Sequence, residues 1–406
     1  MVSNNLIEEL IHLDRLSKEQ AVKYPEKRFL YPQIKSLLTN TNQMAGISGL
    51  RGTGKTILLR QLALEMDKSF YASADTLPVG TDLFELSSSL SSSFGIKFLM
   101  IDEIHTMRDW QGQLKKIYDF LDMKILFTSS SSLELSKGKY DLSRRLTLLS
   151  LPLFSFREYL KFSKKVDVPL ISAEEILMNH NVIYQKLFSY ESYFRTYSEL
   201  GALPACLDSP LRSVVISTIE MVTQKDMLTV GKLSQEDIQS VRAILLFIAR
   251  AGTDGCSYSS IARNVGITKY KAQQFIGMME EASLLKILLP HGANVMPEPK
   301  IMLVPVLRSS LAQGIDEDRL VGALREEFFI HHVTGAGFTV NYLKSKRGEK
   351  LPDYVLYIHN QKLIIEIGGA GKSTSQFKGV EGSEKLVLTQ PALKKGIPLI
   401  LFGFLW

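Results

Sequence analysis

The chain has 406 residues, 45% of them hydrophobic and 22% charged, which is the composition of a folded globular protein. Global disorder, a collagen-like repeat and a coiled-coil rod are therefore excluded. The net charge is +6, and residues 341–406 carry ten Lys and Arg against five Asp and Glu. A basic segment of this kind indicates either contact with nucleic acid or a solubilising surface.

The two cysteines, Cys206 and Cys256, allow one disulfide at most and exclude a four-thiolate zinc site. This cysteine usage is typical of a reducing compartment, so we expect a cytoplasmic location. Acidic residues interrupt the apolar stretch near the N-terminus, and we expect no signal peptide there. The ten-residue apolar run at 397–406 is too short to span a bilayer, so we expect no membrane partner.

The first half of the chain has the pattern of an α/β fold. Residues 1–44 predict a helix followed by a polar lead-in that contains Pro25 and Pro32. Residues 45–160 then alternate short apolar runs with helical patterns, and this alternation predicts a parallel sheet covered by helices on both faces. The expected strands are residues 45–49, 70–74, 98–102, 125–129 and 146–152.

The second half predicts three further modules. Residues 161–234 lack strand candidates and are expected to form a helical lid. Residues 235–310 predict three helices, the third capped by Thr268, and two strands, which is the order of a winged helix-turn-helix. Residues 311–406 predict a small α/β domain with one helix. Its expected strands are FTVNYLK, DYVLYIH, KLIIEIG and IPLILFGF.

A phosphate-binding loop is the strongest motif. Its residues are Gly49, Leu50, Arg51, Gly52, Thr53, Gly54, Lys55 and Thr56, which match G-x-x-x-x-G-K-[ST]. Glycines let the main chain curl so that its N–H groups point at phosphate oxygens, and the following helix directs its positive end at the same anion. Lys55 supplies a cation for the β- and γ-phosphates and the Thr56 hydroxyl a ligand for Mg²⁺, so the motif predicts ATP and Mg²⁺ as cofactors.

Two acidic residues lie at the end of the expected strand 98–102, which is the second strand after the phosphate-binding loop. Asp102 and Glu103 follow the apolar residues 98–101, and ligands of open α/β sheets bind at the carboxyl ends of the strands. We expect Asp102 to hold Mg²⁺ and Glu103 to act as the general base that polarises the attacking water. His105, two residues further on, is interpreted as structural.

Hydroxyls and arginines follow later in the same region. The strand that ends at residues 127–131 carries Ser129, whose hydroxyl would sense the γ-phosphate or position water; the alternative is a loop of helix caps. Arg144 and Arg145 suit the charge that develops on a transferring phosphoryl group, and equally suit a surface ion pair. If either arginine serves the site of a neighbouring copy, the protein must form a homo-oligomer.

The chain resembles a prokaryotic family of AAA+-like ATPases that joins a P-loop core, a helical lid, a winged helix and a C-terminal restriction-endonuclease-like module. The resemblance implies nucleotide binding by Lys55 and Thr56, Mg²⁺ positioning by Asp102 and hydrolysis through Glu103. It also implies a sensor around Ser129 or Ser130 and a functional arginine at 144 or 145. The matching segments are GLRGTGKT (49–56), FLMIDEIHTMRDWQ (98–111), FTSSSS (127–132), RRLTLLSLPLFSFREYL (144–160) and PDYVLYIHNQKLIIEIGG (352–369).

The C-terminal module departs from the nuclease pattern at one position. PD-(D/E)xK nucleases hold Mg²⁺ with two carboxylates, here Asp353 and Glu366, and place a lysine two residues after the second. Gly368 occupies that lysine position. A helical Glu326 or Glu327 would add a third ligand, whereas Lys362 and Lys372 do not have the spacing of the missing lysine. We therefore expect this module to keep the nuclease fold and to bind a metal ion, but the missing lysine argues against DNA cleavage.

The presumed recognition helix of the winged helix carries residues of the types that contact DNA, and the alternative is a helix that only packs against its neighbours. These residues are Lys269, Tyr270, Lys271, Gln273 and Gln274. The sequence as a whole predicts an ATP-hydrolysing enzyme whose nucleotide state moves the winged-helix and nuclease-like modules, with DNA as a candidate partner. Two alternatives remain open: a nucleotide-gated DNA-binding regulator with negligible turnover, and a metal-dependent nuclease regulated by ATP.

Overall fold

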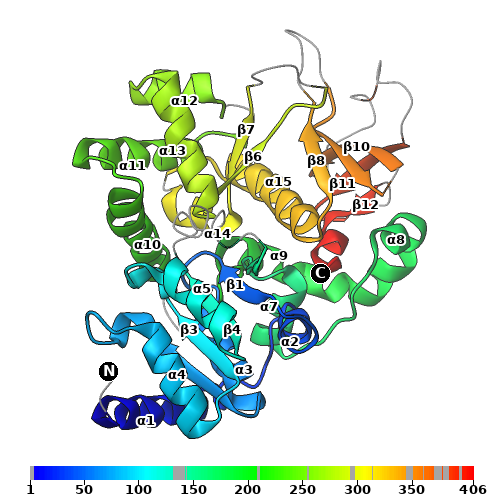
Figure 1. Cartoon of the computed structure of the whole chain (residues 1–406). Helices are drawn as coiled ribbons and strands as arrows, with labels where there is room; N and C mark the ends of the chain where they lie inside the picture. Colours follow the sequence, from blue (N-terminus) through cyan, green and yellow to red (C-terminus); the bar gives the residue numbers. More distant parts are fainter. Residues whose placement is uncertain are drawn as a thin grey trace. The chain divides into compact units, whose positions relative to one another are not determined.

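The computed structural model divides the chain into two compact units, residues 1–152 and 153–406, and each unit is described by itself (Figure 1). The finer division into five domains stays a prediction. The structure describes residues 4–130, 142, 144–207, 211–253, 256–292, 298–312, 314–343, 351–359, 361–369, 377, 384–392 and 396–406.

A five-stranded parallel sheet forms the centre of the first unit, with the strand order β2-β3-β4-β1-β5. The strands are β1 Met44–Ser48, β2 Ser69–Ser73, β3 Phe98–Asp102, β4 Lys124–Ser129 and β5 Leu146–Ser150. All five predicted strands are confirmed within one or two residues at each end. The order places β1 between β4 and β5, so the loop after β1 opens in the middle of the carboxyl edge of the sheet.

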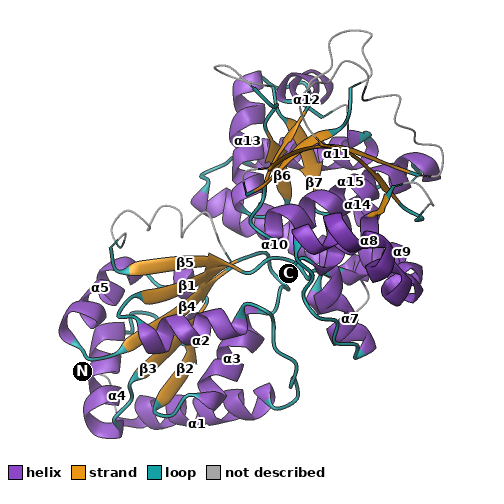
Figure 2. Cartoon of the chain, turned by 90° about the vertical axis from the view of Figure 1, so that its right-hand side faces the viewer, coloured by secondary structure: helices purple, strands orange, loops and turns teal. Residues whose placement is uncertain are grey.

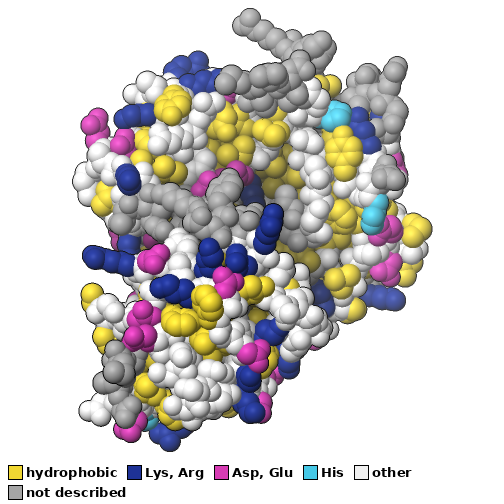
Figure 3. All heavy atoms as spheres, in the orientation of Figure 1, with side chains coloured by type: hydrophobic (Ala, Val, Ile, Leu, Met, Phe, Trp, Pro, Cys, Tyr) yellow, Lys and Arg dark blue, Asp and Glu magenta, His cyan; other side chains and the backbone are white. Residues whose placement is uncertain are grey.

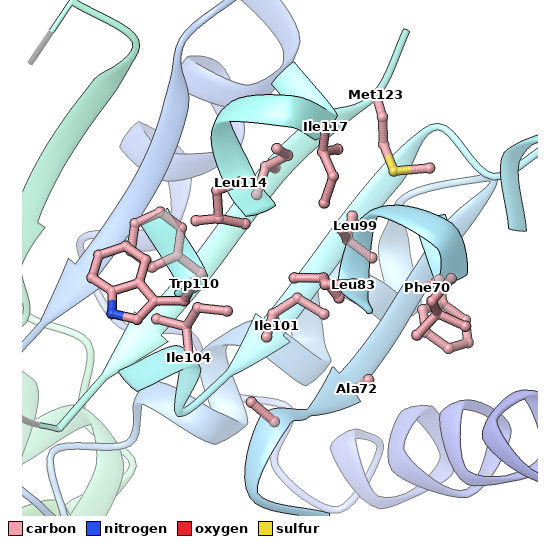
Figure 4. Packing of buried hydrophobic residues seen from close by; sticks show 14 of the residues in the cluster. Phe70, Ala72, Leu83, Leu99, Ile101, Ile104, Trp110, Leu114, Ile117 and Met123 are labelled. Carbon is pink, nitrogen blue, oxygen red and sulfur yellow. The ribbon is translucent and has the colours of Figure 1, made fainter. Parts of the chain in front are cut away.

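Helices cover both faces of this sheet (Figure 2). They are α1 Asn4–Ala21, α2 Tyr31–Asn40, α3 Lys55–Glu65, α4 Leu83–Phe94 and α5 Trp110–Phe120. Alternate strand residues serve the two faces, because successive side chains of a strand point to opposite sides. Phe70, Leu99 and Ile101 pack with α4 and α5 (Figure 4), whereas Tyr71 and Met100 pack with α2 and α3. This arrangement confirms the predicted fold class of a P-loop NTPase core.

The lead-in before β1 differs from its prediction. The segment predicted as a polar connection contains a second helix, α2, whose buried residues are Tyr31, Ile34 and Leu38. Pro32 lies in the first turn of α2, where its missing N–H costs no hydrogen bond and its fixed φ suits the helix. The proline that suggested a loop is therefore compatible with a helix start.

The second unit begins with helices, as predicted. They are α7 Phe156–Lys164, α8 Ala173–Leu187, α9 Phe194–Thr196 and α10 Leu211–Met221, with π-helical turns at Tyr197–Gly201 and Val222–Val230. Ser155 caps α7 and Ser172 caps α8, each through a reciprocal capping box. In the part of the chain that the structure describes, no helix combines the length and the apolar character needed to cross a membrane.

The elements predicted for the winged helix follow in the predicted order. They are α11 Gln235–Arg250, α12 Tyr258–Val265, α13 Lys269–Glu281 and the antiparallel strands β6 Leu285–Leu288 and β7 Lys300–Leu303. The Thr268 side chain caps α13, as expected, and Gly266 ends α12 with a left-handed backbone. We refer to β6 and β7 as the wing. Their role as a DNA-binding winged helix stays a prediction.

A further sheet occupies the C-terminal region, with the order β12-β11-β10-β9-β8. Its strands are β8 Thr339–Tyr342, β9 Tyr354–Ile358, β10 Gln361–Gly368, β11 Glu384–Thr389 and β12 Ile397–Pro398, and α14 Pro305–Leu311 and α15 Glu317–Gly335 precede them. The sequence did not predict β11, which has only three consecutive apolar residues.

The predicted strand IPLILFGF is wrong beyond its first two residues. Leu399–Phe404 forms a 3₁₀ helix that is buried on all sides rather than on alternate sides. A Cβ atom on Gly403 would lie 2.7 Å from the Phe156 Cβ atom, so this turn fits against α7 only because residue 403 is a glycine. A short apolar run does not distinguish a buried strand from a buried helix, because it has no periodicity to measure.

A buried ion pair joins three elements of the second unit. Arg308 on α14 and Glu327 on α15 are 2.7 Å apart and almost fully buried. The Nη1 group of Arg308 also donates to the carbonyls of Ile248, Ala249 and Ala251 at the end of α11. These are carbonyls that a helix end leaves without intrahelical partners, so one guanidinium contacts both the Oε1 atom of the carboxylate and the helix terminus.

We expect Arg308→Met to lower the free energy of unfolding by about 3–5 kcal/mol, because it leaves the Glu327 carboxylate buried without a cation. Burial, opposed by Arg308, raises the pKa of Glu327 to about 7, so the loss grows as the pH rises from 6 to 9. The double variant Arg308→Met/Glu327→Leu should recover the part of the loss that comes from the unpaired carboxylate, whereas the carbonyls at the end of α11 stay without the Arg308 donor. Urea unfolding followed by circular dichroism measures both effects. A double variant as unstable as the single one would contradict this account.

Candidate functional site

The loop after β1 curls back on itself before α3 begins at Lys55. Gly54 has φ 90°, in the left-handed region, and nothing lies within 4 Å of the position of an added Cβ. At the other end of the loop, a Cβ on Gly49 would lie 2.4 Å from the Leu151 carbonyl oxygen. Glycine is thus required at Gly49 by a close main-chain approach and at Gly54 by the backbone conformation.

The ammonium group of Lys55 lies inside this curl. Its Nζ atom is 2.8 Å from the Gly49 carbonyl oxygen and 3.1 Å from that of Leu50, and the residue is only 5% exposed. The Thr53 hydroxyl donates to the same Leu50 carbonyl at 2.8 Å. The loop therefore concentrates a buried cation next to the N-terminus of α3, which is the arrangement that attracts a phosphate group.

Asp102 is held rigidly at the end of β3. It is 2% exposed, its Oδ1 atom accepts a hydrogen bond from the Thr128 hydroxyl, and its Oδ2 atom accepts one from the Tyr71 hydroxyl at 3.2 Å. Burial, followed by the nearby Asp102 charge, raises the pKa of Tyr71, so this phenol remains a donor. The carboxylate is thus oriented by one side chain from each neighbouring strand.

Glu103 lies next to Asp102 with a left-handed backbone, φ 50°. Its Oε2 atom accepts from the Ser130 N–H at 3.1 Å and the Ser130 hydroxyl at 2.8 Å, and lies 3.3 Å from His105 Nδ1. Burial pushes the pKa of Glu103 upward, but Lys55, the Ser130 hydrogen bonds and His105 outweigh it and hold the pKa below its usual value. Glu103 is therefore ionised at neutral pH.

Of the hydroxyls at the end of β4, the predicted Ser129 is fully buried, whereas its two neighbours contact the acidic residues. Thr128 bonds to Asp102 and also accepts from the Glu103 N–H at 3.1 Å, while Ser130 bonds to Glu103. Thr128 was missed as a site residue. The parallel pairing of the two strands was the signal available in the sequence. Ile101 pairs with Phe127, so the next residues, Asp102 and Thr128, lie opposite each other on the same face of the sheet. Ser131 and Ser132 lie outside the described residues.

Arg144 and Arg145 do not lie at this site. The carbonyl of Arg145 accepts from the Met44 N–H at the amino end of β1, so both arginines precede β5 at the opposite edge of the sheet from the loop. Five residues of strand span roughly 16 Å. Arg145 pairs with both carboxylate oxygens of Asp119, at 2.9 and 3.1 Å. Arg145 thus forms the ion pair that was one of its two interpretations. Neither arginine contacts the phosphate-binding loop of its own chain.

The residues present fit a magnesium ion. Thr56 follows Lys55 in the first turn of α3, and the buried Asp102 ends the strand adjacent to β4. Mg²⁺ prefers hard oxygen ligands and is usually held by one or two protein groups together with phosphate oxygens. The Thr56 hydroxyl and the Asp102 carboxylate provide this donor set.

The predicted metal pair in the C-terminal sheet lies at one end of β9 and β10. Asp353 accepts from the Ile367 N–H at 2.8 Å, which places it beside the buried Glu366. The proposed third ligands are engaged elsewhere: Glu327 pairs with Arg308, and Glu326 pairs with Lys300 at 2.8 Å. Among the residues that the structure describes, no group of three metal-ligating side chains is present.

The lysines considered as replacements do not complete the nuclease pattern. Lys362 donates to His291 Nε2 at 3.1 Å, four residues from Glu366 along β10, or about 13 Å. Lys372 lies outside the described residues. Of the two lysines considered, the described one, Lys362, therefore does not stand near Glu366.

The recognition-helix residues have mixed environments. Lys269 pairs with Glu298, and Lys271 pairs with Asp237 at 2.9 Å, so both charges are matched within the chain. Tyr270 and Gln274 are exposed, and Gln273 is half-buried. Acidic side chains lie among the basic ones on the face shown in Figure 3. The described part of α13 thus presents little unmatched positive charge to a DNA backbone.

The strand order and the curled loop define the first unit as a P-loop NTPase core. Residues 41–160 match the AAA_14 family, described as an AAA domain. This match covers the sheet from β1 to β5 together with the loop and both acidic residues. It supports an ATPase-like function for the first unit.

Similar proteins are found across most of the chain. An uncharacterized protein of Methanocaldococcus jannaschii is 27% identical over 415 residues, which cover 92% of this chain and 85% of the relative. An uncharacterized protein of Haemophilus influenzae is 23% identical over 269 residues, which cover 60% of this chain and 62% of that protein.

Solved structures overlap with the chain at low similarity. The Aeropyrum pernix ORC1 protein in complex with DNA is 13% identical with a TM-score of 0.30, over 75% of this chain and 93% of that one. AMPPCP-bound DnaA from Aquifex aeolicus is 17% identical with a TM-score of 0.26, over 63% of this chain and 88% of that one.

We expect Thr128→Val to lower the free energy of unfolding by about 2–3 kcal/mol, because it leaves a buried Asp102 oxygen and the Glu103 N–H without their partner. Thr147→Val removes a half-buried hydroxyl from β5 of the same sheet and should cost less than about 1 kcal/mol. Thermal unfolding of the two variants measures the difference. Equal losses would show that the Thr128 hydroxyl does not hold Asp102.

Proposed function

We propose that this protein is an Mg²⁺-dependent ATPase of the AAA+-like class, with its nucleotide site at residues 49–56. The observation that carries the proposal is the buried Lys55 ammonium within the loop, close enough to the Glu103 carboxylate to lower its pKa. A phosphate-binding cation and an ionised base thus share one edge of the sheet. The AAA domain match over the same residues supports this function.

Phosphate binding would proceed by exchange of partners. Lys55 now donates to the carbonyls of Gly49 and Leu50, and the oxygens of a β- or γ-phosphate are stronger acceptors for an ammonium group. The main-chain N–H groups at the start of α3 add donors to the same anion. Thr56 and Asp102 would hold the magnesium ion, which when bound neutralises charge on the phosphate oxygens.

The two oxygens of Glu103 have different tasks. Oε2 is already engaged by Ser130 and lies beside His105, whereas Oε1 lies 4.0 Å from Arg51 Nη1. We infer that Oε1 takes the proton of the attacking water while Ser130 fixes the orientation of the carboxylate. Ser130 therefore acts as a positioning residue.

The nucleotide state would then move the second unit, which includes the winged-helix elements and the C-terminal sheet. DNA is a possible partner of this motion through the exposed Tyr270 and Gln274, whereas Lys269 and Lys271 are paired within the chain. DNA cleavage is not part of the proposed function, because Glu326 and Glu327 are committed to Lys300 and Arg308.

Lys55→Ala is expected to abolish ATP binding, because it removes the ammonium group that lies inside the curl. Glu103→Gln should keep binding and lose turnover by a factor of at least about 10², the range for a general base. Calorimetry with ATP–Mg²⁺ and a phosphate-release assay measure the two properties, and Lys115→Ala, an exposed lysine of α5, is the control. Unchanged ATP affinity in Lys55→Ala would refute the site. Turnover that Glu103→Gln leaves intact would favour a nucleotide-gated switch.

The rate of hydrolysis should fall on acidification, because Glu103 must be ionised to accept a proton. Ser130 holds the pKa of Glu103 down, so Ser130→Ala should raise that pKa and move the acid limb of the pH–rate profile to higher pH. Ser92→Ala, on the exposed side of α4, should leave the profile unchanged. An acid limb that stays in place in Ser130→Ala would contradict the assigned role of this hydroxyl.

A further inference from the structure

A buried arginine from the lead-in connects the nucleotide loop to the end of the first unit. Arg28 is 5% exposed. Its Nη1 group donates to the carbonyl of Thr53 within the loop at 2.5 Å, and its Nη2 group donates to the carbonyl of Pro152 at 2.8 Å. Pro152 is the last residue of the first unit, and Leu153 begins the second. One guanidinium thus bridges the loop and the junction between the units.

The junction segment also contacts the loop through the main chain. The Leu151 N–H donates to the Ser48 carbonyl at 2.7 Å, immediately before the loop begins. The Leu151 carbonyl lies so close to Gly49 that no larger residue would fit there without a shift. The chain therefore leaves the first unit packed directly against the nucleotide loop.

The side chain of Arg28 is presented from a firmly anchored segment. The Gln61 side chain on α3 donates to the main-chain carbonyls of Tyr24 and Glu26. Tyr31 and Lys27 both bond to Glu65, and these partners lower the pKa of Glu65 to about 2, Lys27 contributing most. The lead-in is thus fixed on α3, so the main chain that carries Arg28 is held in place.

We propose that Arg28 transmits the nucleotide state of the loop to the junction at Pro152 and so governs the movement of the second unit. This inference rests on the proposed ATPase function. When Lys55 moves to a phosphate, the Gly49 and Leu50 carbonyls lose the Lys55 donor, Leu50 keeps its hydrogen bonds from Thr53, and the loop rearranges. The planar guanidinium holds Thr53 and Pro152 in a fixed relation, so a shift of one carbonyl must move the other or break the bridge.

The proline directs where this displacement goes. The ring of Pro152 fixes its φ angle, so a movement of its carbonyl is absorbed by its own ψ angle and by Leu153, at the start of the second unit. A residue with a free φ angle could absorb the same displacement by rotating about its own φ, and Leu153 would not move. Pro152 therefore passes the displacement from Arg28 to Leu153.

The test is a distance measurement between the two units by electron paramagnetic resonance, made on the full chain. Spin labels are attached to Asp67→Cys in the first unit and Met178→Cys in the second, both exposed positions, after replacement of Cys206 and Cys256 by serine. AMPPCP with Mg²⁺ is the probe, and calorimetry on the same samples reports whether it binds. The wild-type background should show a distance distribution that changes when AMPPCP binds.

Arg28→Met should bind AMPPCP with an affinity within about tenfold of the wild type and lose the distance change. Pro152→Gly, which keeps the carbonyl and frees φ, should reduce the change and provides the test if Arg28→Met does not fold. Tyr31→Phe removes a neighbouring anchor but leaves the guanidinium bridge, and it should retain the full change.

A distance change that persists in Arg28→Met and Pro152→Gly would overturn the proposal, as would a wild type that binds AMPPCP without any change. A wild type that fails to bind AMPPCP would instead overturn the ATPase function, and with it the signal that Arg28 would transmit. Calorimetry separates these two failures, since it reports binding independently of distance.

Discussion

The buried Lys55 ammonium is the constraint on which the first unit depends. A charge removed from water requires close partners, and here these partners are the carbonyls of Gly49 and Leu50. The loop can offer both carbonyls only because it curls, and its curl requires glycine where Leu151 approaches and where the backbone is left-handed. The same atoms that stabilise the lysine are weaker acceptors than phosphate oxygens, so the folded loop is already prepared for exchange.

The sheet brings the remaining groups to this loop through strand order alone. Because β1 lies between β4 and β5, and β3 lies next to β4, the carboxyl ends of three adjacent strands carry the loop, the hydroxyls and the acidic residues. Thr128 then contacts both Asp102 and the Glu103 N–H, and Ser130 contacts the Glu103 carboxylate. Each acidic group is therefore oriented by the neighbouring strand rather than by its own loop.

These contacts explain which features the sequence predicted and which it did not. The strands of the first unit were predictable because buried parallel strands are continuous apolar runs, and the loop because its chemistry demands fixed residue types. Thr128 and Arg28 were missed because their partners lie far away in the sequence, and those of Arg28 are main-chain carbonyls with no sequence signature. For Arg145, residue type alone left a phosphate contact and a surface ion pair equally open, whereas strand direction puts it at the other edge of the sheet, where it pairs with Asp119.

Hydrogen bonds connect the parts of the second unit to one another. His291 and Glu298, which lie between β6 and β7 in the sequence, bond to the C-terminal sheet: Tyr342 of β8 accepts from the His291 N–H, and its hydroxyl donates to the Glu298 carbonyl. Lys362 of β10 also donates to His291, and Arg308 ties α14 and α15 to the end of α11. Relative motion of these parts would break these hydrogen bonds, and the cost is largest for the buried contacts of Arg308. If the proposed displacement reaches Leu153, these contacts would carry the winged-helix elements and the C-terminal sheet together, and the nucleotide site would move one body rather than rearrange two.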